Sequence, residues 1–226
     1  VITGVAGVES ERNNGYVRIA SGKNLTTEYA QLGTTPGVLI QAQGYSTEGY
    51  LFSAFGRADY KYDDKYLFGL SFREDGSSLF DPEYRWGTFT AYSIGWILSD
   101  EKFLKQYDWL SLLKLRGSMG QTGNNSIPQN KNLTTYETNV NFGYGEETVI
   151  SGGTKPTTIG NNSLTWETTA SYDIGIDYGF LNNRLTGSIA YYFQDVNGLV
   201  LAASVPKSTG LSGNQEIWGN MGQIYN

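Results

Sequence analysis

The stretch ASYDIGIDY at residues 170–178 alternates large apolar side chains with small or charged ones at every second position. The stretch LTGSIAYYFQ at residues 185–194 repeats this pattern after a short interruption. A period of two sends successive side chains to opposite faces of a β-strand, whereas an amphipathic helix repeats about every 3.6 residues. Both stretches therefore predict β-strands with one apolar face and one polar face.

Four earlier stretches alternate in the same way, at residues 52–62, 66–73, 91–98 and 113–119. An opening strand near Ile2 to Ser10 and a closing strand near Gln215 to Asn226 bring the expected total to about eight. Most of these stretches approach the 9 to 11 residues that a tilted strand needs to cross a bilayer. Such a sheet is expected to be antiparallel and all-β.

The connections between these strands fall into two length classes. Three are short or moderate, at residues 63–65, 99–108 and 181–183, and four are long, at residues 11–47, 74–85, 121–164 and 197–214. The two classes alternate along the chain, so each is expected to lie on its own rim of the sheet. Short turns on one rim and long loops on the other are typical of transmembrane β-barrels. A soluble β-sandwich also alternates apolar and polar residues, but charged polar faces and aromatic strand ends favour the barrel.

Composition narrows the possible chemistry. The 226 residues include no histidine and no cysteine, which removes the commonest general base and the thiolate metal ligands. The formal net charge is −6, which argues against a nucleic-acid partner. Asp173 and Asp177 lie on the same face of one strand, about 13 Å apart, too far for a glycosidase pair. We therefore expect no catalytic residues, no cofactor and no metal site, since turn chemistry explains the acidic loop at residues 75–83 better than calcium binding.

Several longer motifs then appear in a fixed order. These are FREDGSSLF at 72–80, RWG at 85–87, SIGW at 93–96, LKLRGS at 113–118, LTWETT at 164–169, DIGID at 173–177 and NNRL at 182–185. In order and spacing, residues 48–226 resemble the SusC/RagA-like TonB-dependent outer-membrane transporters. Glu74 and Leu79 occupy positions where the family often has basic residues, and Ile97 replaces a usual arginine. Residues 1–47 match only weakly.

This resemblance implies an architecture larger than the chain. Family members look like plugged barrels of about 22 strands. Residues 1–226 would then form a partial barrel domain of about eight strands, and the plug domain, the TonB box and the C-terminal closing strands would lie elsewhere. Because an eight-stranded arc would leave two sheet edges unpaired in lipid, we expect the first and last strands not to pair with each other.

The resemblance also implies a function in the outer membrane of a Gram-negative bacterium. The protein would import a glycan or an oligopeptide together with a SusD-like surface lipoprotein. The TonB-ExbB-ExbD motor would energise it through the missing N-terminal region, and no enzymatic step would be involved. Two alternatives stay open: a passive or structural outer-membrane barrel, and a soluble glycan-binding β-module.

Strand parity assigns each face its residues. A charged side chain on the lipid face costs about 2–4 kcal/mol at the bilayer midplane, so the charged face should line the lumen. The expected lumen-facing residues are Arg57, Arg73, Arg116, Asp173 and Asp177. The expected outward-facing residues are Phe52, Tyr60, Phe68, Phe72, Trp96, Tyr172, Ile174, Ile189 and Tyr191. Aromatic residues among Asn, Gly and Thr in the outer loops suit contacts with a ligand or partner, and these candidates are Tyr136, Phe142, Tyr144 and Trp218.

Overall fold

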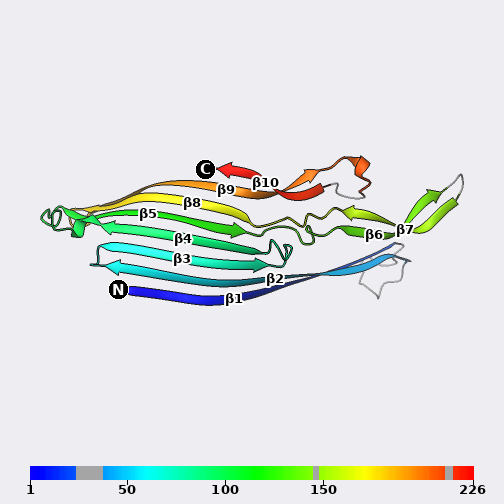
Figure 1. The fold of residues 1–226 in the computed structure, drawn as a ribbon, viewed down its shortest axis with the longest axis horizontal. Coiled ribbons are helices and arrows are strands. Elements are labelled where there is room, and N and C mark those ends of the chain that lie inside the picture. Colours follow the sequence, from blue (N-terminus) through cyan, green and yellow to red (C-terminus); the bar gives the residue numbers. More distant parts are fainter. Residues whose placement is uncertain (24–37, 145–147, 212–215) are drawn as a thin grey trace.

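A computed structural model describes residues 1–23, 38–144, 148–211 and 216–226 of the chain. Eight strands form one antiparallel sheet in the order β1-β2-β3-β4-β5-β8-β9-β10, and β6 and β7 form a separate two-stranded sheet (Figure 1). The strands are β1 (Ile2–Lys23), β2 (Val38–Tyr62), β3 (Tyr66–Ser77), β4 (Trp86–Ile97), β5 (Leu110–Asn124), β6 (Thr135–Tyr144), β7 (Thr148–Thr158), β8 (Glu167–Phe180), β9 (Leu185–Ser204) and β10 (Glu216–Tyr225). Two 3-10 turns, η1 (Leu98–Asp100) and η2 (Lys207–Thr209), complete the regular structure of this part. Within it, no helix is long and apolar enough to cross a membrane.

The predicted all-β antiparallel sheet of about eight strands is therefore confirmed, and the local cause lies in the turns. Asp63 and Asp64 adopt left-handed backbone angles between β2 and β3, and Lys65 N donates to the Tyr62 carbonyl at 3.1 Å. Asp and Asn tolerate this region, which two-residue hairpin turns require. The β8–β9 turn has positive φ over residues 181–183 as well. We call the end that carries these turns the short-turn rim and the opposite end the long-loop rim.

The ladder separates the two predicted faces. Phe68 pairs with Ile94, and Ile174 pairs with Tyr191, so large apolar side chains form rows across neighbouring strands. Eight of the nine residues expected to face outward are exposed, with values from 42% for Tyr60 to 71% for Tyr191. Trp96 is only partly exposed, because its ring stacks on Tyr66 and its indole nitrogen donates to Glu101 Oε1 at 3.2 Å. We call this side of the sheet the apolar face and the other side the polar face.

Two of the expected long loops are largely strand. β1 and β2 continue as a paired ribbon from the main sheet to Lys23 and Val38, across most of the region expected to be a loop at residues 11–47. The region at residues 121–164 contains the β6–β7 hairpin, which projects beyond the long-loop rim in Figure 1. A two-stranded ribbon outside a sheet has water on both faces, so its sequence does not need to alternate apolar and polar residues. The alternation of long and short connections by rim still holds.

The first and last strands of the main sheet lie at its opposite edges. β1 pairs with β2 and β10 pairs with β9, and no ladder joins β1 to β10 among the described residues (Figure 1). The expectation that these two strands do not pair with each other is confirmed. Gln215, the expected first residue of the last strand, lies outside the described residues.

The buried apolar side chains gather at the long-loop rim rather than along the sheet. We call this group the loop-rim cluster, and it consists of Phe80, Phe89, Ile127, Leu164 and Trp166. Its members come from the β3–β4 connection, from β4, and from the segments that follow β5 and precede β8. The cluster therefore fixes three connections to the same end of the sheet.

Candidate functional site

The polar face carries its charges in paired arrangements, and Arg116 on β5 is the centre of one. Its Nη1 donates to Asp173 Oδ1 on β8, and its Nε lies 3.5 Å from Asp177 Oδ1. Asp177 also accepts a hydrogen bond from the Ser188 hydroxyl at 2.7 Å. One guanidinium therefore bridges two carboxylates on the neighbouring strand, and the three side chains remain about one-third exposed.

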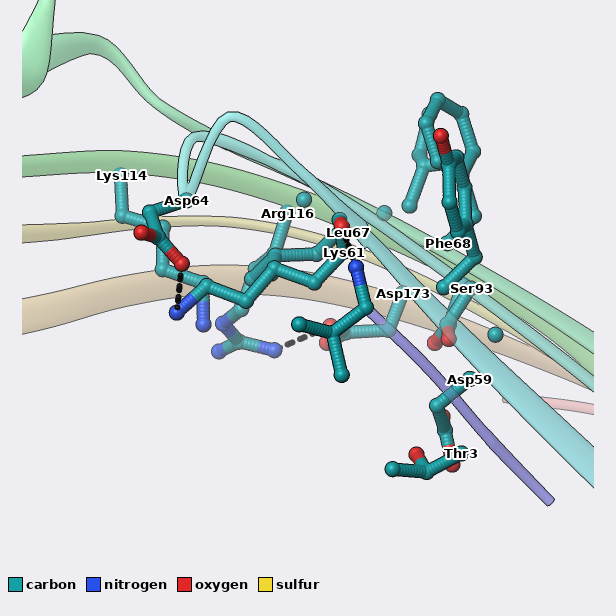
Figure 2. A pocket seen from close by; sticks show the side chains of 17 residues that line it. Thr3, Asp59, Lys61, Asp64, Leu67, Phe68, Ser93, Lys114, Arg116 and Asp173 are labelled. Atoms are coloured by element: carbon teal, nitrogen blue, oxygen red, sulfur yellow. Dashed lines mark hydrogen bonds and ion pairs between the residues drawn. The ribbon is translucent and has the colours of Figure 1, made fainter.

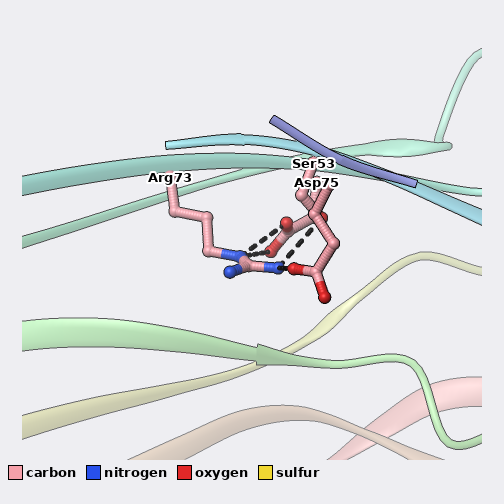
Figure 3. A network of polar contacts seen from close by, with 4 residues as sticks. Ser53, Arg73 and Asp75 are labelled. Atoms are coloured by element: carbon pink, nitrogen blue, oxygen red, sulfur yellow. Dashed lines mark hydrogen bonds and ion pairs between the residues drawn. The ribbon is translucent and has the colours of Figure 1, made fainter. Parts of the chain in front are cut away.

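A second arrangement surrounds Arg73 on β3 (Figure 3). Its Nε donates to Asp75 Oδ1 at 2.7 Å, and its Nη2 donates to Ser53 Oγ at 2.9 Å and to Glu9 Oε2 at 3.1 Å. Ser53 is fully buried and Asp75 is 8% exposed, whereas Glu9 is exposed. Asp75, on the same strand as Arg73, is therefore the better shielded of the two carboxylates. The group ties β1, β2 and β3 together. Arg57 on β2 instead pairs with Asp59 two residues along the strand, at 2.8 Å, and both stay exposed.

Beside the Arg116 group, the polar face is hollowed near the short-turn rim (Figure 2). The hollow has a volume of about 700 Å³ and extends from β1 to β8. Three cations line it, Lys61, Lys114 and Arg116, together with three carboxylates, Asp59, Asp64 and Asp173. Lys61 Nζ lies 2.8 Å from Asp64 Oδ1. The surface thus presents both signs of charge to a polar partner and offers no nucleophile paired with a histidine, since the sequence has none.

Metal ligands do not converge in the part of the chain that the structure describes, where no group of three or more His, Cys, Asp or Glu side chains could hold an ion. Glu101, in the connection after β4 at the short-turn rim, has a structural environment instead. The Tyr66 hydroxyl donates to it at 2.8 Å, and Lys65 Nζ lies 3.6 Å away. The pKa of Glu101 is lowered, first by the Tyr66 hydrogen bond, then by that from Trp96, with smaller help from Lys65.

Of the four residues expected to contact a ligand or partner, the structure describes the side chains of Tyr136 and Trp218, which lie on different sheets. Tyr136 lies on β6 and is 63% exposed. Phe142 and Tyr144 also belong to β6, but their side chains lie outside the described residues. Trp218 on β10 packs against the loop-rim cluster, and Lys131 Nζ lies 5.6 Å from its ring centroid.

The long-loop rim contains polar anchors that sequence reasoning missed. Trp166 Nε1 donates to the Arg85 carbonyl at 2.9 Å, which links the segment before β8 to the segment before β4. Asn220 Nδ2 donates to the carbonyls of Thr165 at 2.9 Å and Gly198 at 2.8 Å. These residues are far apart in sequence and follow no period. Only the tryptophan in the connection before β8 could have drawn attention to them, since Asn220 lies within β10.

Comparison with known proteins agrees with this architecture. The family model "TonB dependent receptor-like, beta-barrel" matches residues 3–226. The chain is 36% identical over 190 residues to the TonB-dependent receptor SusC of Bacteroides thetaiotaomicron, covering 83% of this chain and 19% of SusC. It is also 36% identical over 181 residues to the TonB-dependent receptor P39 of Formosa agariphila, covering 80% of this chain and 17% of P39.

A solved structure shares the fold over nearly the whole chain. The RagAB peptide transporter matches with a TM-score of 0.82 and 26% identity, covering 99% of this chain and 24% of that one. The chain thus spans about a fifth of the length of the curated relatives it matches. The open antiparallel sheet, its exposed apolar face and these matches lead to one assignment. The chain belongs to the TonB-dependent receptor β-barrel family, as a SusC homologue, and it supplies strands to a transmembrane barrel of the Gram-negative outer membrane.

Proposed function

We propose that the whole protein is an active nutrient importer that takes up a glycan or an oligopeptide. It works with a SusD-like surface lipoprotein and is energised by TonB-ExbB-ExbD. The observation that carries this proposal is the match of the whole described sheet to the RagAB peptide transporter, joined to the sequence identity with SusC. The RagAB peptide transporter supports the peptide class, and the glycan class rests on the resemblance of the sequence motifs to the SusC/RagA-like family. Transport of this kind breaks no covalent bond in the substrate, in keeping with a sequence that lacks histidine and cysteine.

In this proposal the polar face lines the barrel lumen. Arg57, Arg73, Arg116, Asp173 and Asp177 lie opposite the rows of exposed aromatic side chains. An inverted sheet would place these charges in hydrocarbon, at a cost of about 2–4 kcal/mol each near the midplane. The hollow near the short-turn rim is lined by both cationic and anionic side chains, which suits contact with a polar domain inside the barrel.

Residues 1–226 would form one part of the barrel wall, within a plugged barrel of about 22 strands. The outer edges of β1 and β10 carry backbone groups that must be paired in lipid, where each unpaired group costs several kcal/mol. Both edges would therefore pair with strands beyond the described sheet. Residues 1–226 expressed alone should aggregate or fail to insert into lipid vesicles. A heat-resistant monomeric barrel formed by this segment would contradict the proposal.

At the long-loop rim, Tyr136, Phe142, Tyr144 and Trp218 are proposed to contact the ligand or the lipoprotein. Aromatic rings stack on sugar rings and pack against peptide side chains, and they lose little conformational entropy on binding. Tyr136 is the most direct candidate to test, because its side chain is largely exposed on the projecting hairpin.

The test is uptake by the bacterium that carries the gene. Cells with the intact gene should accumulate fluorescently labelled oligosaccharides or oligopeptides, and cells lacking the gene should not. A protonophore should abolish uptake, and an affinity-tagged protein should retain a SusD-like lipoprotein during purification. Uptake that persists after the proton gradient collapses would instead identify a passive pore. Loss of the gene with no effect on either substrate class would overturn the proposal.

A further inference from the structure

Two hollows lie along the apolar face, one toward the long-loop rim and one near the middle of the sheet, and both are lined by strands β4, β8 and β9. The upper hollow, toward the long-loop rim, has a volume of about 390 Å³. Its lining includes Trp86, Thr88, Thr168, Asn197 and Asn220. The lower hollow has a volume of about 480 Å³, and its lining includes Tyr92, Ile94, Gly117, Met119, Ile174 and Tyr191. The lower hollow also touches Ser93, Ser118 and Asp173 of the polar-face hollow, but its large apolar lining residues lie on the apolar face.

The upper hollow lies at the level where the barrel wall divides. The β4–β5 ladder ends at the pair Ala91–Gly120, so residues 86–90 of β4 pair only with β3. Phe89 and Trp166 pack together across the division, and the hollow lies beside them. Hydroxyl, amide and indole groups line it, and none of its described lining residues carries a charge.

This chemistry fits a sugar better than a phosphate. An exposed indole, here Trp86 at 53% exposure, offers a stacking surface, and threonine hydroxyls and the Asn197 amide can both donate and accept hydrogen bonds. The Asn220 amide is already used by backbone groups. Glu74, the cross-strand neighbour of Thr88, occupies the same parity on β3. Its negative charge next to the hollow disfavours a phosphate inside the hollow, so the proposed contacts are with the sugar rings.

The lower hollow exists because Gly117 has no side chain, whereas its neighbours across the strands have large ones. Its cross-strand partners are Ile94 on β4 and Ile174 on β8, both more than 60% exposed. A β-carbon built at Gly117 would approach Ile94 Cγ1 no closer than 3.6 Å, so the space is open. The lining is almost wholly hydrocarbon and aromatic. This groove suits an acyl chain.

The distance between the hollows matches one leaflet of a bilayer. Thr168 and Ile174 are six residues apart on β8, about 20 Å along the strand. At a tilt of about 40° this separation corresponds to about 15 Å along the membrane normal, which is half of a hydrocarbon core about 30 Å thick. We propose that the two hollows form a single binding site for an outer-leaflet glycolipid, with its sugar headgroup above and an acyl chain below.

The test uses the full-length protein, purified and delipidated in detergent, with lipid A as the probe. Lipid A should bind with one molecule per chain, and phosphatidylethanolamine should bind at least about tenfold more weakly because it lacks a sugar. Gly117→Leu fills the lower groove and should weaken lipid A binding at least about tenfold. Asn197→Leu keeps the volume but removes the amide, and should weaken binding about fivefold or more.

Gly56→Leu is the matched control. Gly56 has the same parity on β2, and a β-carbon there would approach Val5 O no closer than 3.8 Å, so this substitution adds the same side chain away from the site. Its affinity for lipid A should stay within about twofold of the parent. Equal affinity for lipid A and phosphatidylethanolamine would overturn the proposal, and so would equal effects of Gly117→Leu and Gly56→Leu. Either result would mean that lipids bind the barrel surface without specificity. Complete displacement of lipid A by the soluble disaccharide chitobiose, or loss of binding when the lipid A phosphates are removed, would also overturn the proposal.

Discussion

Replacing Ile174 with arginine tests which face of the sheet meets lipid. Ile174 is 65% exposed on the apolar face, six residues from Phe180 at the short-turn rim. Six residues correspond to about 20 Å along the strand and about 15 Å along the membrane normal at a tilt of about 40°. This depth lies near the middle of the hydrocarbon core. Arginine there costs about 2–4 kcal/mol, which lowers the folding equilibrium constant by about 30-fold to 1,000-fold.

Ser118→Arg is the control, because it introduces the same charge on the opposite face of the sheet. Ser118 is the register partner of Asp173 on the polar face, beside the same part of β8. An arginine at this position should cost less than about 1 kcal/mol, because it gains a carboxylate neighbour and stays out of lipid. Both variants of the full-length protein would be refolded into lipid vesicles. Unfolding in a urea titration would then be monitored by the heat-dependent shift of the folded band on gels. A cost for Ser118→Arg equal to that of Ile174→Arg would refute the assignment of the faces.

Three further substitutions test the rims. A β-carbon at Gly123 would lie 2.0 Å from Phe89 Cζ, so Gly123→Val should lower the unfolding free energy by about 1–3 kcal/mol in denaturant titration, and adding Phe89→Leu should restore part of it. Asn220→Ala should cost about 1–3 kcal/mol in the same titration, because two backbone carbonyls lose their donor. Glu101 has a pKa lowered below its ordinary 4.5, chiefly by Tyr66, so its stabilisation is complete above pH 4.5 and is lost as the pH falls through the lowered pKa. Near-ultraviolet circular dichroism should record this loss in the parent and no such acid step in Glu101→Gln.

Most of the main sheet could be predicted because lipid and polar solvent act on alternate residues. At residues 52–62 and 170–178 this difference produces a period of two strong enough to predict the strand and the face on which each side chain lies. The tight turns also carry their own signals, since aspartate and asparagine adopt positive φ at residues 63–64 and 182–183.

The ribbon formed by the ends of β1 and β2 could not be predicted in this way. Its strands extend past the sheet, where both faces meet water, and Arg12, Glu48 and Tyr50 interact on its surface. The Tyr50 hydroxyl donates to Glu48 at 2.6 Å, and this bond together with the Arg12 guanidinium lowers the pKa of that carboxyl. Backbone pairing and such cross-strand contacts hold the ribbon without any apolar pattern in the sequence.

The charged residues of the polar face could be placed by parity, but their partners could not. Parity puts Arg116 and Asp173 on one face; only the β5–β8 ladder, which skips the whole β6–β7 hairpin, brings them together. The same ladder brings Asp177 to the same guanidinium, although the two carboxylates are four residues apart on one strand. Long-range pairing of this kind depends on strand order, which no local pattern encodes.

The distribution of burial assigns different physical roles to the two parts of the sheet. Ile174, Ile189 and Tyr191 are each at least 65% exposed, and a continuous surface of such residues in water would promote aggregation. In lipid the same residues are solvated, so tight packing against other side chains is not required of them. The cluster around Phe80 and Leu164, both essentially fully buried, is packed as in a soluble core. Outward positions on the sheet should therefore tolerate changes of volume and resist changes of polarity, whereas positions in the loop-rim cluster should be sensitive to both.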